Sequence, residues 1–319
     1  MDRVTGGLDR IQNNSFGDDR PAIILTASDE RLVRAANPIL SAPEELFRLN
    51  ELDVFYDDEH RALWTYMRPA GRPSFTPAML RDFEDWQRLI PQGFGKGKVP
   101  LDFLILGSRA HGVFCFGGDL ELFQSLIREE DRDGLVAYGF RCVEILDRNI
   151  KALDIPMLTI GLVEGAALGG GFEAVLSFDF IIAERGATFG LPEVMFGLFP
   201  GMGAHAFLIR KLGSAMAERI ILSNETYTAE QMYELGIVHK LAEPGQGRAA
   251  CEEFMQKSAR RHSGLVHAKA AERVTAPVPL SELKAIVELW ADAALQLQDK
   301  DLKIMSRLAA AQAKLMRAA

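Results

Sequence analysis

Two glutamates and two glycine-rich turns are the residues of this 319-residue chain that could carry out chemistry. Glu173 follows three consecutive glycines, Gly169 to Gly171, in "EGAALGGGFEA", and Glu193 lies further along in "FGLPEV". A second glycine turn, "FCFGGDL", covers residues 114–120. Each turn follows a predicted strand and begins a predicted helix, where unpaired backbone N–H groups and the helix dipole favour negative charge.

Two carboxyl groups beside two glycine turns could support general acid–base catalysis next to an oxygen atom that gains negative charge. Two turns directed at one point would supply a pair of N–H donors for a carbonyl oxygen. Two carboxyl groups facing one thioester could handle the proton at C2 and the water or hydroxyl at C3. The residues therefore predict reversible addition of water across a carbon–carbon double bond, with the pKa values of the glutamates set apart by burial and mutual repulsion.

A dinucleotide-binding turn is the competing interpretation of the glycine triplet. Gly169, Gly171 and Ala174 match the G-x-G-x-x-A fingerprint. The following helix, however, has room for only about two turns before the next predicted strand, and an N-terminal βαβ unit is missing. The sequence also lacks a P-loop, a nucleophile elbow and metal-ligand spacing. We therefore favour the acid–base interpretation and expect neither a cofactor nor a bound metal.

Short strands that alternate with amphipathic helices must position these turns. Thr76 is a candidate helix N-cap with Pro77 at the first helical position. The alternation predicts an α/β core with parallel strands. Buried strands are expected at 101–108, 156–165 and 178–184, and helices at 75–90, 118–131 and 135–153.

The chain divides into three predicted regions. Residues 1–48 form an N-terminal extension without visible chemistry, residues 49–247 the core, and residues 248–319 a helical region with apolar residues at spacings of three and four. The net charge of −8 argues against nucleic acid or an anionic membrane as the main partner. The N-terminus shows no apolar signal segment, so we expect a cytoplasmic protein. The three cysteines are expected to be buried thiols.

The long stretch "VEGAALGGGFEAVLSFDFIIAERGATFGLPEVMFGLFPGMGA" resembles the signature of the crotonase (enoyl-CoA hydratase/isomerase) superfamily. The resemblance extends from about residue 52 to the C-terminus. It implies the crotonase spiral of ββα units, with C-terminal helices that build trimers, often paired into hexamers. It also implies that the N–H groups of Phe116 and Gly170 form the oxyanion hole, and that Glu173 and Glu193 are the catalytic acid/base pair.

Further stretches, among them "FGGDLELFQSLIREEDR" and "VPLSELKAIVELWADAALQLQDKDLKIMSRL", resemble the diffusible signal factor synthases. These crotonase-fold enzymes dehydrate a 3-hydroxyacyl chain on acyl carrier protein and hydrolyse the thioester, which releases a cis-2-unsaturated fatty acid for quorum sensing. The resemblance implies the same activity here, on a thioester of acyl carrier protein or coenzyme A. A regulatory sensor kinase is a candidate partner, above all if the protein acts by binding alone.

An acyl chain of about ten or more carbons needs an apolar tunnel. Similarity to the synthases implies that Met202, Trp290 and Leu308 line it, and plain core or interface packing is the alternative for each. An unbroken helix would put Trp290 and Leu308 on one face, whereas a turn near residues 298–301 would bring them together from two helices. Phe116 is bulky where many hydratases have a small residue, so short-chain enoyl-CoA turnover is not expected.

Two other functions stay open. One is an enoyl-CoA hydratase or isomerase of fatty-acid metabolism. The other is a catalytically idle crotonase-fold protein that binds a regulatory protein, and the presence of both Glu173 and Glu193 counts against it.

Overall fold

The computed structural model of the chain describes residues 42–318, with side chains described as far as residue 314. Most of the predicted N-terminal extension lies outside the described residues. The first described element is a 3-10 helix, η1 (Glu44–Phe47), which packs against the first strand and the first long helix.

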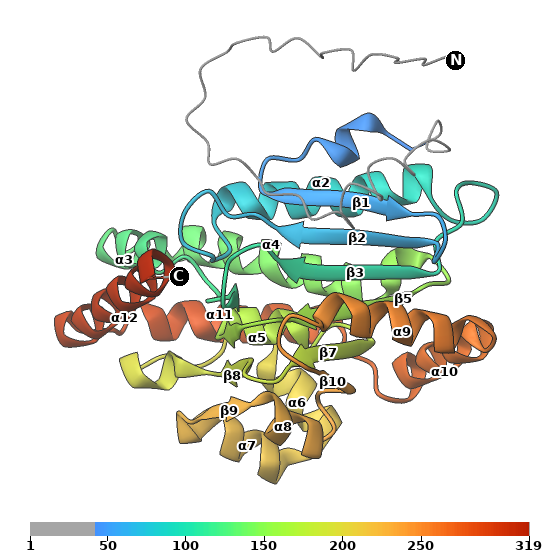
Figure 1. The fold of residues 1–319 in the computed structure, drawn as a ribbon. Helices are drawn as coiled ribbons and strands as arrows, with labels where there is room; N and C mark the ends of the chain where they lie inside the picture. The colour runs from blue at the N-terminus through green and yellow to red at the C-terminus, as the bar shows by residue number, and fades with distance from the viewer. Residues whose placement is uncertain (1–41, 319) are drawn as a thin grey trace, which may run out of the picture.

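A six-stranded sheet forms the centre of the molecule (Figure 1). Its outer strand β1 pairs antiparallel with β2, and all other neighbours in this sheet are parallel, as the sequence predicts for the core. The three predicted buried strands are confirmed as β3, β5 and β7, which are two, four and two residues shorter than expected. In spatial order the strands are β1 (Leu52–Asp57), β2 (Ala62–Met67), β3 (Phe103–Ser108), β5 (Leu158–Val163), β7 (Phe180–Glu184) and β10 (Lys240–Ala242).

A second, four-stranded sheet is built from the short strands that follow those of the first. The chain passes from β3 to β4, from β5 to β6 and from β7 to β8, and each time crosses from one sheet to the other. This repeated passage is the crotonase spiral expected from the sequence. The strands of the second sheet are β4 (Val113–Cys115), β6 (Ala166–Leu168), β8 (Thr188–Gly190) and β9 (Thr226–Thr228).

Helices cover both faces of the first sheet. On one face lie α2 (Pro77–Gly93) and α4 (Arg132–Ile150), and on the other α9 (Gly247–Ala259) packs against the sheet (Figure 1). Helix α2 begins as predicted, because the Thr76 hydroxyl accepts a hydrogen bond from the Met79 N–H at 3.1 Å. The remaining helices of the core are α3 (Leu120–Arg128), α5 (Gly170–Val175), η2 (Ala152–Asp154), η3 (Pro192–Phe196), α6 (Ala204–Leu212), α7 (Ser214–Ser223) and α8 (Ala229–Glu234).

The described part of the C-terminal region is helical. After α9 come α10 (His262–Thr275), α11 (Leu280–Ala294) and α12 (Asp299–Ala318). The chain turns between α11 and α12, so Trp290 and Leu308 belong to two helices and not to one continuous helix. Helix α12 packs beside α3 and η3, and the Ser306 hydroxyl donates to Gln124 Oε1 at 2.6 Å (Figure 1). None of the helices in residues 42–318 is long and apolar enough to cross a membrane.

Candidate active site

The first glycine turn corrects one predicted role. The N–H of Phe116 donates to the carbonyl oxygen of Pro73 at 2.7 Å, so it is already engaged, and its assignment to the oxyanion hole is wrong. Gly117 has a φ of 91° and breaks the regular course of the chain between Phe116 and Gly118. The N–H of Gly118 has no acceptor among the described residues. Gly118 is therefore the donor that this turn offers. The two glycines mark the turn in the sequence but do not show which N–H group is free.

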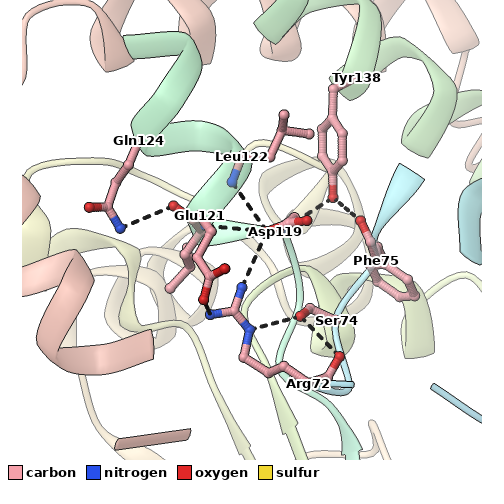
Figure 2. Close-up of polar contacts among 9 residues, drawn as sticks. Arg72, Ser74, Phe75, Asp119, Glu121, Leu122, Gln124 and Tyr138 are labelled. Carbon is pink, nitrogen blue, oxygen red and sulfur yellow. Dashed lines mark hydrogen bonds and ion pairs between the residues drawn. The ribbon is translucent and has the colours of Figure 1, made fainter. Parts of the chain in front are cut away.

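Asp119 holds this turn in place through several partners (Figure 2). Its Oδ1 accepts the N–H groups of Glu121 and Leu122, each at 3.2 Å, and so caps α3. The same oxygen lies 3.3 Å from Arg72 Nη2. The Asp119 N–H donates to the Tyr138 hydroxyl at 3.3 Å, and that hydroxyl donates to the carbonyl oxygen of Phe75 at 2.6 Å. The residue next to Gly118 is thus tied to α3, to α4 and to the loop before α2.

The three glycines of the second turn each admit a different neighbour. A Cβ on Gly169, whose φ is 53°, would lie 2.5 Å from Glu193 Oε1. A Cβ on Gly170 would lie 2.6 Å from Met202 Sδ, and one on Gly171 would lie 2.2 Å from the carbonyl oxygen of Cys115. The triplet therefore brings the start of α5 against a carboxyl group, a thioether and the other glycine turn. The N–H of Gly170 has no acceptor in the described part of the chain.

Glu173 lies on α5 and is 1% exposed. Its Oε1 accepts two backbone hydrogen bonds, from Met202 N–H at 2.9 Å and from Ala204 N–H at 2.8 Å. Burial raises the pKa of Glu173 to about 7, although these N–H groups favour the ionised form and pull the pKa down. Glu173 is thus a carboxyl group fixed in position by the "PGMGA" loop.

Glu193 lies on η3 and has a contrasting environment. Its Oε2 is buried and has no hydrogen-bond partner among the described residues. Burial raises the pKa of Glu193 well above its ordinary value, and the nearby charge of Glu173 raises it further. Glu193 therefore keeps its proton to a higher pH than Glu173. Acid–base catalysis needs one proton donor and one proton acceptor, and this difference suits Glu193 to the first role and Glu173 to the second.

Gly118, Gly170, Glu173 and Glu193 line one pocket, whose inner walls are mainly apolar. The structure brings Met202, Trp290 and Leu308 to this pocket together with Glu173 and Glu193. The Trp290 ring packs against Gly201, where a Cβ would lie 2.6 Å from Cγ of the indole. The full lining is Phe116, Gly118, Leu120, Phe123, Tyr138, Gly139, Gly169, Gly170, Glu173, Pro192, Glu193, Phe196, Leu198, Gly201, Met202, Val287, Trp290, Leu308 and Gln312.

No cysteine lies among the residues that line this pocket. Cys115, Cys142 and Cys251 are buried free thiols, as predicted, and burial raises the pKa of each. Within residues 42–318, no group of three or more His, Cys, Asp or Glu side chains is arranged to hold a metal ion.

Comparisons with known proteins show which family the chain resembles in sequence. Residues 101–309 match the sequence profile described as "Enoyl-CoA hydratase/isomerase". The chain is 30% identical to YngF of Bacillus subtilis (strain 168) over 198 residues, which cover 62% of this chain and 71% of YngF. It is 32% identical to the crotonyl-CoA hydratase of Syntrophomonas wolfei over 146 residues, 45% of this chain and 53% of that protein.

Solved structures show the same fold. The structure of DspI from Pseudomonas aeruginosa aligns with a TM-score of 0.56 at 24% identity, over 71% of this chain and 87% of DspI.

Proposed function

Because this chain belongs to the enoyl-CoA hydratase/isomerase family of the crotonase superfamily, we propose that it is a 3-hydroxyacyl-thioester dehydratase that also hydrolyses the thioester. Family membership supports hydratase-type chemistry on an acyl thioester. The finer proposal is that the substrate is carried by acyl carrier protein and that the product is a cis-2-unsaturated fatty acid signal.

The proposed dehydration uses the two glutamates and the two free N–H groups. The thioester oxygen accepts hydrogen bonds from Gly118 and Gly170, which stabilise the enolate. The ionised glutamate removes the proton from C2, and the protonated glutamate gives its proton to the departing 3-hydroxyl group. The C3–O bond breaks, the C2–C3 double bond forms and water leaves. The pair still holds one proton afterwards, with its position exchanged.

Thioester hydrolysis can follow at the same site. The carboxylate that remains ionised takes a proton from a water molecule, and the hydroxide attacks the thioester carbonyl. The C–S bond then breaks, and the glutamate returns the proton it took from water to the departing thiolate, which releases the free acid and the carrier thiol. Neither step needs a redox cofactor, because only protons, water and the thiol are exchanged.

One observation carries this proposal. Glu193 Oε2 is buried without a partner in a pocket that also contains two N–H groups without acceptors. Buried polar groups that lack partners are costly, by about 1–3 kcal/mol each. A thioester substrate would satisfy all three groups at once.

An enoyl-CoA hydratase of fatty-acid metabolism is the second candidate. The relatives named as hydratases favour it. The donor of the first turn is Gly118 and not the bulky Phe116. The size of the residue at the donor position therefore no longer counts against turnover of short-chain enoyl-CoA.

A product assay separates the candidates. The purified protein is incubated with 3-hydroxydodecanoyl acyl carrier protein, and the products are identified by mass spectrometry. Free cis-2-dodecenoic acid is expected. Reversible hydration of enoyl-CoA without release of a fatty acid would replace the proposal by the second candidate. Turnover of neither substrate would favour the catalytically idle binding protein.

Glutamate variants test the site in the same assay. Glu173→Ala and Glu193→Ala should each lower the dehydration rate by at least about 10²-fold, the usual contribution of one general acid or base. Glu184→Gln is the matched control, because Glu184 is a buried glutamate outside the pocket that accepts the Gly247 N–H at 2.7 Å. Near-normal rates in either alanine variant would remove that residue from the mechanism.

A further inference from the structure

A second cavity lies directly behind the catalytic pocket. It occupies the space between α2, α4 and α5, and its volume is about 30 Å³. Met202 is the one residue that lines both cavities. The second cavity is lined by Phe75, Leu80, Phe83, Trp86, Gln87, Leu106, Ile145, Leu146, Asn149, Ala174, Ser177, Phe178 and Met202.

Met202 has a backbone that is fixed by a hydrogen bond and a side chain that can change its conformation. Its N–H is held by Glu173 Oε1 at 2.9 Å. Its Sδ packs where a Cβ on Gly170 would lie, 2.6 Å away, beside the proposed oxyanion donor. Methionine is unbranched and has three rotatable side-chain bonds, so it adapts to irregular space. The thioether can therefore change position without disturbing the carboxyl group that the backbone holds.

The second cavity has the chemistry of a site for hydrocarbon. Most of its lining is apolar, and α2 contributes Leu80, Phe83 and Trp86. The donors of its polar residues are engaged: Gln87 Nε2 bonds the Ile145 carbonyl at 2.9 Å, and Asn149 Nδ2 bonds the Ser177 hydroxyl at 2.8 Å. Apolar cavities of this kind stay dry and accept apolar ligands.

An ordered water is the competing occupant. Gln87 Oε1 and Asn149 Oδ1 are buried without partners among the described residues. The cavity exceeds the about 10–15 Å³ that one water needs. A bound water would satisfy these two oxygens and would hold the cavity closed to a hydrocarbon chain.

We propose that Met202 is a movable partition that sets the acyl-chain length, and that the cavity behind it is reserve space for the end of the chain. This inference rests on the proposed function, since it concerns the acyl substrate of the same pocket. A chain longer than the catalytic pocket pushes the Met202 thioether into the second cavity. Removal of the thioether lets the chain itself enter.

Binding of coenzyme A thioethers tests this without turnover. The S-octyl, S-decyl, S-dodecyl and S-tetradecyl thioethers of coenzyme A have neither a 3-hydroxyl group nor a thioester bond, so they can be neither dehydrated nor hydrolysed. Their affinities are measured by calorimetry for the natural protein and for Met202→Ala. The variant should prefer chains about two carbons longer, and each additional buried methylene should tighten binding about fourfold.

Filling the second cavity supplies the matched comparison. Leu80→Phe adds bulk on α2 inside that cavity, and Leu89→Phe makes the same change on the same helix outside both cavities. Leu80→Phe should weaken binding of the longest chains and should cancel the gain in the Met202→Ala background, whereas Leu89→Phe should do neither. Unchanged chain preference in Met202→Ala, or equal effects of the two phenylalanine variants, would overturn the inference and favour the water-filled cavity.

The two proposals can fail separately. A shift of chain preference in binding together with no fatty acid in the product assay would reject the proposed dehydratase and thioesterase while leaving Met202 as the partition. Release of fatty acid without a shift of chain preference would support the proposed dehydratase and thioesterase and would reject Met202 as the partition.

Discussion

Glu173 and Glu193 share one pocket but differ in what surrounds their carboxyl groups. Glu173 accepts two backbone N–H groups, which stabilise its negative charge. Glu193 has a buried oxygen without a partner, and the charge of Glu173 opposes its ionisation. The division into one carboxylate and one carboxylic acid therefore comes from hydrogen bonding and repulsion, and not from the residue types, which are identical.

This asymmetry predicts a bell-shaped dependence of activity on pH. As the pH falls through about 7, Glu173 gains a proton and the site loses its base. When the pH rises above the raised pKa of Glu193, this residue ionises and the site loses its acid. We expect kcat/KM for dehydration of 3-hydroxydodecanoyl acyl carrier protein, measured between about pH 5 and 10, to decline on both sides. A rate that stays level across that range would contradict the assigned charge states.

At the scale of secondary-structure elements, the start of α3 controls the position of Gly118. Asp119 caps the helix and also pairs with Arg72, which links α3 to the loop before α2 (Figure 2). Arg72 also donates from Nε to the Ser74 hydroxyl at 3.0 Å. The position of one N–H donor thus depends on contacts among three segments of the chain.

Arg72→Gln should therefore lower kcat more than it raises KM. Loss of the ion pair, worth about 1 kcal/mol for a partly buried pair, would let the turn move and would cost about fivefold in kcat. Steady-state kinetics with 3-hydroxydodecanoyl acyl carrier protein measures both constants. Arg88→Gln, which breaks an exposed ion pair with Asp85 on α2, is the control and should leave both unchanged. Equal losses from both variants would point to general destabilisation instead.

At the scale of the whole molecule, the spiral brings distant parts of the chain to one pocket. The two glutamates come from the middle of the chain, and Trp290 and Leu308 come from α11 and α12 near its end. The C-terminal helices therefore complete the pocket wall. Several large apolar side chains remain exposed on the single chain: Met195, Ile209, Leu222, Tyr233, Val274 and Leu289.

A homotrimer is the assembly that we predict. Association would cover part of the exposed apolar surface, and closed symmetric oligomers are the common form of such assemblies. Light scattering coupled to size-exclusion chromatography should give about three times the 35.3 kDa mass of the chain. A mass of one chain at micromolar concentration would show that the exposed side chains do not support assembly, whereas twice the trimer mass would indicate the hexamer.

Local sequence patterns were enough for several elements. Thr76 and Pro77 predicted the start of α2, and the apolar runs predicted β3, β5 and β7, because caps and buried strands depend on residue types close in sequence. The turn between α11 and α12 was left open, because the apolar spacing on either side suits one helix as well as two. The antiparallel β1 was not predicted, since its pairing with β2 is a tertiary contact.

For the candidate site, the sequence by itself determined the chemical groups: two carboxyl groups, two glycine turns and an apolar C-terminal region. Only the tertiary structure decided which N–H groups are free. Phe116 donates to Pro73, a partner far along the chain that spacing could not reveal, and this leaves Gly118 as the donor. The tertiary structure also decided the raised pKa of Glu193, because burial and repulsion depend on which segments meet in space. The cavity behind Met202 likewise exists only where α2, α4 and α5 meet.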